Sequence, residues 1–151
     1  MGKIGVGVVG CGFVGRGAHV PAFAAMDNAQ LVAVADADEV RLGKVQKKYG
    51  VKTTYKDHKQ LLADPAIQAV VVSLPTALHA AASLAAIEAG KHVLCEMPLA
   101  SNLQDVDRMI EAADKARVTL MPSLTFHFTP NYVKAKQLID RQGINLSIWH
   151  N

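Results

Sequence analysis

Cysteine and long apolar runs are scarce in this 151-residue chain. Its two cysteines, Cys11 and Cys95, cannot build a disulfide framework, and neither has the close cysteine or histidine spacing of a zinc site. We therefore expect two free thiols and no bound metal. No apolar run reaches the roughly 18 residues of a membrane span, and Met1-Gly2-Lys3 leads into an apolar segment without a signal peptide. These absences predict a cytoplasmic protein that does not bind membranes.

Clustered charge is missing as well. The chain has 16 Lys and Arg against 13 Asp and Glu, the net charge is +3, and the densest basic pair is Lys47-Lys48. This scattered distribution predicts no nucleic-acid surface. Hydrophobic residues make up 50% of the chain, and a domain commonly has about 100 to 150 residues, so the chain can bury a sizeable core.

Short apolar runs alternate with helical patterns along the chain. We expect strands near residues 4–9, 31–35, 51–55, 67–74, 91–96 and 118–121, and helices near 13–26, 39–49, 57–62, 77–89, 102–116 and 131–141. This rhythm predicts an α/β fold of the Rossmann type, a doubly wound parallel sheet with strand order 3-2-1-4-5. Pro21 should kink or restart the first helix, because proline donates no backbone hydrogen bond.

Some helix details can also be predicted. In the helix 39–49, Val40, Val45 and Tyr49 can face the sheet. Ser101 and Gln104 have the spacing of a capping box for the helix 102–116. The apolar stripe of that helix would contain Leu103, Val106, Met109, Ile110 and Ala113. For the last helix, Thr129 resembles an N-cap, Pro130 a first residue and Gly143 a stop.

The first strand runs into Gly10, Gly12 and Gly15, which have G-x-G-x-x-G spacing. In a dinucleotide site, such glycines allow a tight turn, a close approach of backbone to pyrophosphate, and close helix–strand packing. Backbone N–H groups at the helix N-terminus then face the anion. Glycine pairs also occur in tight turns that bind nothing, so the motif needs support from its surroundings.

That support comes from Asp36, which ends the second strand and lies 21 residues after Gly15. A carboxylate at this interval accepts hydrogen bonds from the adenosine ribose and would repel a 2′-phosphate. The sequence therefore favours NAD over NADP as the cofactor. Asp38 is an alternative ribose partner, and Asp36 could instead cap the following helix.

Ligands of doubly wound sheets lie at the carboxyl ends of the strands. This rule selects Gly10–Gly15, Asp36, Ser73–Thr76 and Cys95–Pro98 as segments that meet at one edge. His92 would lie at the opposite edge, in a structural role.

With these motifs in order, the chain resembles the N-terminal half of the glucose-fructose oxidoreductase and inositol dehydrogenase (Gfo/Idh/MocA) family of NAD(P)-dependent enzymes, which act mostly on sugars and polyols. The resemblance covers residues 3–143 and is carried by GVVGCGFVG, VAVADAD, LPTALHA, AGKHVLCEMPLA and YVKAKQLIDRQG. It implies that the cofactor is held by Gly10, Gly12, Phe13, Val14, Gly15, Asp36, Leu74, Pro75, Thr76, His79 and Glu96, with Pro98 beside the nicotinamide.

The chain departs from that family at Met97, where the family typically has the lysine of a Glu-Lys-Pro motif, which assists proton transfer. A thioether carries neither proton nor charge, so Met97 cannot replace this lysine. Of the catalytic pair Glu96 and Met97, we expect Met97 to be non-functional and Glu96 to be structural.

The second departure is length, since the resemblance leads us to expect a C-terminal α+β domain after the 151 residues of this sequence. We expect residues 1–122 to form the dinucleotide-binding domain and 123–151 to form a linker helix and the start of the next domain. We also expect this chain alone to be inactive, and its lineage to transfer hydride to or from a sugar-like substrate. The alternative is a module that binds cofactor without turnover.

Further expectations concern two histidines and the surface near residues 124–128. His79 could contact the cofactor or be a packing residue, and His127 is a weak candidate for a catalyst. Without a second domain, Phe126, Phe128 and Tyr132 should be exposed near the face formed by 124–128 and the last helix. We expect this face to mediate either self-association into a homo-oligomer or the binding of a partner.

Overall fold

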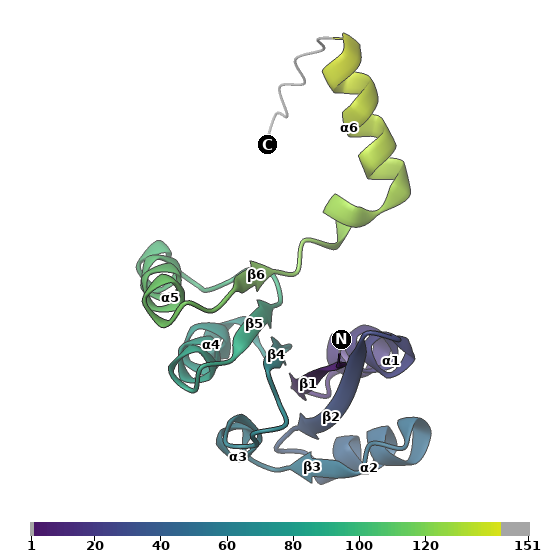
Figure 1. Cartoon of the computed structure of the whole chain (residues 1–151), viewed down its shortest axis with the longest axis vertical. Helices are drawn as coiled ribbons and strands as arrows, with labels where there is room; N and C mark the ends of the chain where they lie inside the picture. The colour runs from purple at the N-terminus through teal and green to yellow at the C-terminus, as the bar shows by residue number, and fades with distance from the viewer. Residues whose placement is uncertain (1, 143–151) are drawn as a thin grey trace.

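Six parallel strands form the centre of the molecule, in the order β3-β2-β1-β4-β5-β6 (Figure 1). The computed structural model describes residues 2–142. The strands are β1 (Ile4–Val9), β2 (Ala29–Ala35), β3 (Thr53–Tyr55), β4 (Ala69–Val72), β5 (His92–Cys95) and β6 (Leu120–Pro122). The predicted doubly wound sheet and its strand order are confirmed.

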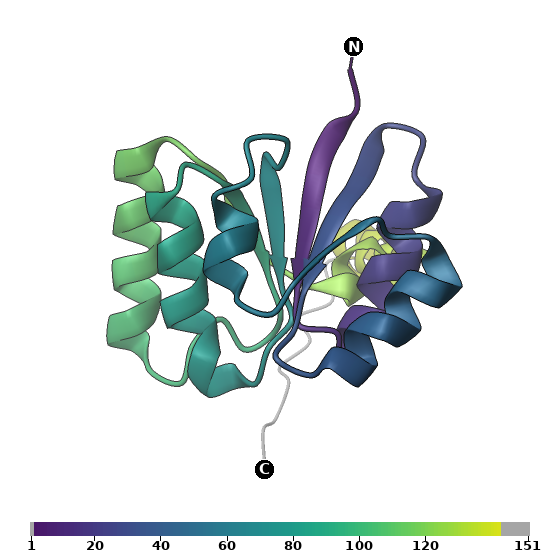
Figure 2. The same ribbon diagram turned by 90° about the horizontal axis from the view of Figure 1, so that it is seen from below.

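Helices cover both faces of this sheet, as Figure 2 shows. One face carries α1 (Val20–Ala25) and α2 (Glu39–Tyr49), and the other carries α3 (His58–Leu62), α4 (His79–Glu88) and α5 (Leu103–Ala116). The central strand β4 is apolar on both sides: Val71 packs in the cluster below α1 and α2, whereas Val70 and Val72 pack in the cluster below α3, α4 and α5. A continuous apolar run is what a parallel strand covered on both faces requires.

The helix after the glycine loop changes its winding before Pro21. A π-helical turn covers Gly15–His19, in which Val20 N–H donates to Gly15 O, and α1 then begins at Val20. Pro21 thus lies in the first turn of α1, where its missing N–H is tolerated. The predicted restart of the helix at this proline is confirmed.

The prediction for the buried face of α2 was partly wrong. Val45 is buried as predicted, but Val40 is 64% exposed, and Leu42 is buried in its place. Leu42, Val45 and Tyr49 follow the spacing of three and four residues that keeps side chains on one helix face. Val40, two residues before Leu42, points away from that face.

Two predictions for α5 were also wrong. The N-cap is Asn102 and not Ser101: Asn102 Oδ1 accepts from Asp105 N–H, and Asn102 Nδ2 donates to Asp105 Oδ2, each at 2.8 Å. Leu103 and Ile110 are exposed, so the buried stripe is narrower than predicted and centres on Met109 and Ala113.

The chain leaves the sheet after β6 through a 3₁₀ turn, Thr125–Phe128, and ends its described part with α6 (Pro130–Gln142), which projects away from the sheet (Figure 1). Pro130 is the first helical residue, as predicted, but the Thr129 hydroxyl donates to Thr125 O, 3.1 Å away. Phe126, which stacks on Tyr132, and Phe128 are exposed as predicted. Self-association stays a prediction, and Gly143 lies outside the described residues.

Within residues 2–142, none of the helices combines the length and the apolar character needed to cross a membrane.

Candidate functional site

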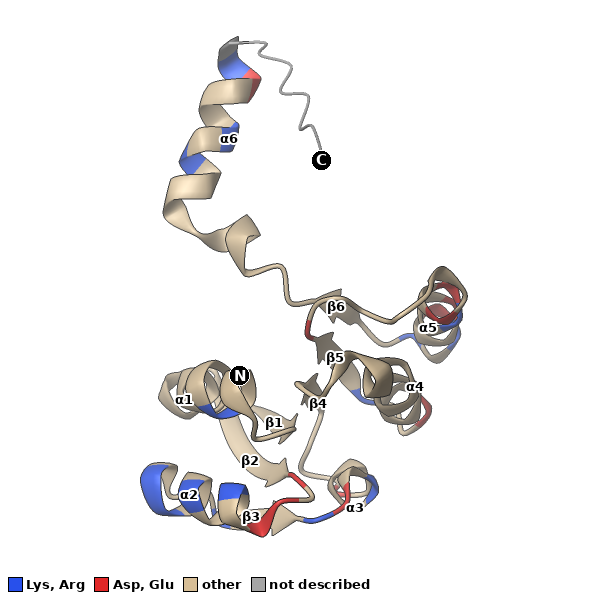
Figure 3. Ribbon diagram, turned by 180° about the vertical axis from the view of Figure 1, so that it is seen from behind, with Lys and Arg blue, Asp and Glu red and all other residues tan. Residues whose placement is uncertain are grey.

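The predicted segments meet at the carboxyl ends of the strands and line a cleft of about 500 Å³. Most residues predicted for the cofactor or catalytic site line this cleft, whereas Gly15, Asp38, Pro98 and His127 do not. Ser73, from the predicted segment Ser73–Thr76, also lines it, and Ala37, Arg41 and Leu78 line it but were missed. Acidic residues, drawn as red ribbon in Figure 3, follow both β2 and β5 at this edge. The cleft is therefore flanked by a carboxylate near each end.

The three glycines of the loop have different surroundings. A Cβ atom at Gly10, whose φ is +97°, would lie 2.1 Å from Ser73 O, and one at Gly15 would lie 1.9 Å from Gly10 O. A Cβ atom at Gly12 would meet no protein atom within 4 Å. Gly10 and Gly15 are thus required by the fold, whereas Gly12 leaves backbone open to the cleft.

A helix begins directly after this open backbone. Arg16 N–H donates to Gly12 O at 3.1 Å, so the N–H groups of Phe13, Val14 and Gly15 belong to the first turn, where a helix offers no carbonyl partner. The Phe13 side chain is 90% exposed and leaves the turn accessible. Such a turn attracts a phosphate group through its N–H groups and the helix dipole.

Asp36 connects the end of β2 to the glycine loop. Its Oδ2 accepts from Cys11 N–H at 2.7 Å, and its Oδ1 accepts from Asp38 N–H at 2.9 Å. Each carboxylate oxygen has a second lone pair that can accept a ligand hydroxyl. The hypothesis that Asp36 caps α2 was wrong, because the cap is Asp38, which accepts from Val40 N–H and Arg41 N–H.

Arg41 lies beside both carboxylates. Its Nε is 3.2 Å from Asp38 Oδ2, and its Nη1 is 3.7 Å from Asp36 Oδ2. The signal that could have identified it is its place three residues after Asp38, in the first turn of α2, where side chains at this spacing meet.

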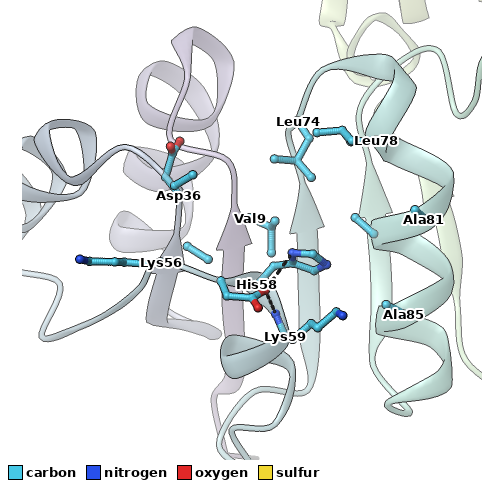
Figure 4. Close-up of a pocket in the computed structure, with 13 residues that line it drawn as sticks. Val9, Asp36, Lys56, His58, Lys59, Leu74, Leu78, Ala81 and Ala85 are labelled. Atoms are coloured by element: carbon cyan, nitrogen blue, oxygen red, sulfur yellow. Dashed lines mark hydrogen bonds and ion pairs between the residues drawn. The ribbon is translucent and has the colours of Figure 1, made fainter.

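An apolar cavity of about 390 Å³ opens beside Asp36, between the end of β2 and α4 (Figure 4). Leu74, Leu78, Ala81 and Ala85 form one wall, while polar side chains of Lys56, His58 and Lys59 lie on the side of α3. This shape suits a flat, largely apolar ring system close to a hydroxyl acceptor.

At the other end of the cleft, Glu96 follows β5 and pairs with His19. His19 Nε2 donates to Glu96 Oε1 at 2.6 Å, and Met97 N–H donates to Glu96 Oε2 at 3.2 Å. Burial raises the pKa of Glu96, but hydrogen bonds from His19, Ser123 and the Met97 N–H outweigh it and hold the pKa below its ordinary value. Glu96 is therefore an ionised, anchored carboxylate at neutral pH. Sequence reasoning missed His19, which lies 77 residues away.

His79 is 1% exposed, and both its ring nitrogens lie next to backbone carbonyls. Met97 is 51% exposed at the mouth of the cleft and is followed by a cis peptide bond to Pro98. His92, at the amino end of β5 as predicted, accepts from Thr119 N–H at 3.0 Å. His127 lies in the 3₁₀ turn after β6, and it does not line the cleft.

The two cysteines are free, as predicted, and both are buried. Burial, together with the charge of Asp36, raises the pKa of the Cys11 thiol to about 12. Burial also raises the pKa of Cys95. Neither thiol is a thiolate nucleophile at neutral pH. In the part of the chain that the structure describes, no three His, Cys, Asp or Glu side chains gather in a way that could hold a metal ion.

A doubly wound sheet with an open glycine loop at a helix N-terminus and a carboxylate after the second strand defines a dinucleotide-binding Rossmann domain. Residues 4–124 match the family described as "Oxidoreductase family, NAD-binding Rossmann fold". The chain belongs to this Gfo/Idh/MocA family, which confirms the resemblance seen in the sequence.

Similar proteins include the myo-inositol 2-dehydrogenase of Thermotoga maritima, 40% identical over 92% of this chain and 41% of the relative, and a D-xylose 1-dehydrogenase (NADP(+)) of Haloferax volcanii, 34% identical over 96% of this chain and 45% of the relative. The crystal structure of scyllo-inositol dehydrogenase from Lactobacillus casei with bound NAD(H) and scyllo-inositol aligns with a TM-score of 0.88 and 26% identity, over 95% of this chain and 42% of that chain. The chain thus spans about two fifths of the length of the relatives that it matches.

Proposed function

We propose that this chain is the cofactor-binding part of an NAD-dependent oxidoreductase that acts on a sugar, a polyol or a related carbonyl compound. The observation that carries the proposal is the open backbone at Gly12, which faces the cleft directly before a helix N-terminus. When bound, the nicotinamide would supply the acceptor or donor of the hydride.

The residues present fit a dinucleotide from the pyrophosphate outward. The pyrophosphate would lie on Gly12 and on the N–H groups of Phe13 and Val14, because a side chain at Gly12 would fill the space where backbone meets phosphate. The adenine ring would occupy the apolar cavity between Leu74 and Leu78 on one side and Ala37 on the other.

Asp36 would accept hydrogen bonds from the adenosine ribose. A 2′-phosphate at the same place would meet two carboxylates, Asp36 and Asp38, and a single guanidinium, Arg41, that is already paired with both. This charge balance favours NAD over NADP. Relatives with either preference are known, since the Haloferax enzyme is named for NADP and the Lactobacillus structure holds NAD(H).

On the nicotinamide side, Leu74, Pro75, Thr76 and Glu96 would orient the ring. Sugars and polyols are proposed as substrates because the relatives are named for myo-inositol, scyllo-inositol and D-xylose. We further propose that residues 1–122 form the cofactor domain and that residues 123–151 lead toward a substrate domain, because α6 projects away from the sheet (Figure 1).

A second candidate function is a dinucleotide-binding module without turnover, and Met97 favours it. The thioether at the mouth of the cleft cannot donate or accept the proton of a reacting hydroxyl, and Glu96, held ionised by His19, is a poor proton donor near pH 7. Both candidates predict cofactor binding and differ in proton transfer.

Calorimetric titration of the 151-residue chain with NAD and NADP tests the shared part of both functions. We expect NAD to bind in the micromolar range and more tightly than NADP. Absence of binding of either cofactor to a folded chain would contradict the proposal.

Incubation of the same chain with NAD and either myo-inositol or D-xylose, followed through the absorbance of NADH, separates the two functions. We expect no turnover by this chain alone. Robust polyol oxidation would show that proton transfer does not need the motif lysine.

A further inference from the structure

A basic surface, made of Arg16, Lys44, Lys47 and Lys48, lies next to the glycine loop. The four side chains line one open hollow of about 690 Å³ between the π-helical turn and α2. Within residues 2–142, no acidic side chain lines this hollow. Figure 3 shows the basic residues along α2. Arg16 comes from a different element, so the fold gathers charges that are separate in the sequence.

None of these four charges is offset by a neighbouring carboxylate. In the part of the chain that the structure describes, Arg41 and Lys56 form ion pairs, but no member of the basic surface does. The three lysines are exposed, and Arg16 is half-buried. Lys48 Nζ lies 5.0 Å from the centre of the Tyr49 ring, which is uncharged. The basic surface therefore presents unpaired positive charge to solvent.

This surface is continuous with the cofactor cleft. A smaller hollow of about 300 Å³ joins the two, because it shares Gly12 and Arg41 with the cleft and Arg16 and Lys44 with the basic surface. The exposed side chain of Phe13 lines all three. An anion on the basic surface can therefore move along the protein to Gly12.

The cleft itself offers little attraction to an anion. Its charged lining consists of the carboxylates of Asp36 and Glu96 and the guanidinium of Arg41, which is paired with Asp36. The pyrophosphate of a dinucleotide is negatively charged, so both carboxylates repel it during its approach. Attraction at long range must come from outside the cleft, and the basic surface lies on the side of Gly12.

We propose that Arg16, Lys44, Lys47 and Lys48 form an entry surface that attracts the pyrophosphate of the dinucleotide and directs it to Gly12. Charges of this kind raise the association rate constant, because their attraction acts before contact is made. Exposed lysines suit this role, since it requires charge but no fixed geometry. The inference rests on the proposed function, because it needs a cleft that binds a dinucleotide.

The test measures the binding kinetics of NADH to the 151-residue chain by stopped-flow fluorescence of the reduced nicotinamide. Displacement with excess NAD gives the dissociation rate constant. The variant is Lys44→Gln/Lys47→Gln, which spares the half-buried Arg16 and the contact of Lys48 with Tyr49.

At about 10 mM salt, we expect the association rate constant of this variant to be about three- to tenfold below that of the wild type. Its dissociation rate constant should change less than about twofold, because the two lysines do not hold the bound cofactor. At about 1 M salt, where charges are screened beyond about 3 Å, the two chains should associate at equal rates.

The matched control is Lys115→Gln/Arg117→Gln, which removes the same net charge. Both residues are exposed at the end of α5, which leads into the amino end of β6 and so lies opposite the cleft. We expect this control to associate at the wild-type rate within about twofold. An equal loss in both double variants would show that only net charge matters, and it would overturn the entry surface.

Other outcomes are also decisive. An increase in the dissociation rate constant of Lys44→Gln/Lys47→Gln, without a change in association, would assign these lysines to the bound complex and overturn the entry surface. Wild-type association that does not depend on salt would overturn it as well, and this result needs no variant to fold. If the wild type binds no NADH, the proposed function fails together with the entry surface, whereas binding without these rate effects contradicts the entry surface alone.

Discussion

Different kinds of contact stabilise the two ends of the cleft. At the glycine loop, the carboxylate of Asp36 accepts from backbone N–H groups of Cys11 and Asp38. At the end of β5, side chains reach partners on distant segments: His19 binds the Glu96 carboxylate, and His79 Nδ1 lies next to the backbone oxygen of Pro98. One end is built mainly by the course of the backbone, and the other by the identity of individual side chains.

This difference has consequences for substitutions. The glycine-loop end of the cleft tolerates few changes of backbone conformation, but its geometry depends little on which side chains surround it. A side-chain-built end can exchange a residue such as the exposed Met97 without loss of fold, and thereby gain or lose chemistry. In our two candidate functions, cofactor binding depends mainly on the glycine loop, whereas proton transfer depends on the residue at position 97.

The largest expected effect separates the glycines of the loop. Gly12→Val should lower the affinity for NAD at least about 100-fold, because the new side chain fills the open space where phosphate would approach, and it should leave the melting temperature nearly unchanged. Calorimetric titration and thermal unfolding measure the two quantities.

The control is Gly10→Ala, whose Cβ would lie 2.1 Å from Ser73 O at a φ of +97°. It should destabilise the fold by about 3 kcal/mol or more. If Gly12→Val unfolds the chain as Gly10→Ala does, our assignment of separate roles is wrong.

Asp36→Ala should lower the affinity for NAD about tenfold and bring NADP closer to NAD, because the ribose acceptor is lost and so is one of the two carboxylates that repel a 2′-phosphate. The backbone N–H groups of Cys11 and Asp38 also lose their acceptor, at a cost of about 1 to 3 kcal/mol in the free energy of unfolding. Calorimetric titration with each cofactor measures the ratio of the two dissociation constants, for NAD and for NADP. An unchanged ratio would shift the choice between cofactors to another residue, with Arg41→Ala as the next variant.

Glu96→Gln should destabilise the chain by about 1 to 3 kcal/mol at neutral pH, because it weakens the contact with the buried His19. The pKa of Glu96 is lowered in the folded chain, so its ionised form contributes stability above its ordinary value of 4.5, and this contribution is lost as the pH falls through the folded value. We measure the free energy of unfolding of the wild type and of Glu96→Gln with denaturant at several pH values. We expect the two free energies to converge in acid. A constant difference across the range would point to packing instead of charge.

Met97→Lys should have the smallest effect on the isolated chain. The side chain is exposed, so we expect a change in the free energy of unfolding within about 0.5 kcal/mol and a change in NAD affinity within about twofold. Thermal unfolding and titration measure both. A large loss of stability would contradict this prediction and would mean that Met97 packs on a neighbouring side chain.

The sequence predicted the fold and the backbone-built end well, for a local reason. Glycine spacing, the strand that ends at Asp36 and the apolar run of β4 are each read within one short segment, and the chain connectivity of parallel strands then gathers their carboxyl ends at one edge. The predictions that failed also concerned short segments, but they needed contacts to decide between neighbours. Val40 and Leu42 compete for one helix face, and Ser101 and Asn102 compete for one cap.

By itself, the sequence determined the doubly wound sheet, the glycine loop and the carboxylate after β2, because each follows from backbone geometry and from the order of polar and apolar residues. Only the tertiary structure decided which partners two of the buried groups have: His19 for Glu96, and the carbonyl of Pro98 for His79. Such pairs join residues from different elements, and no spacing along the chain encodes the few ångströms that bring a donor to its acceptor.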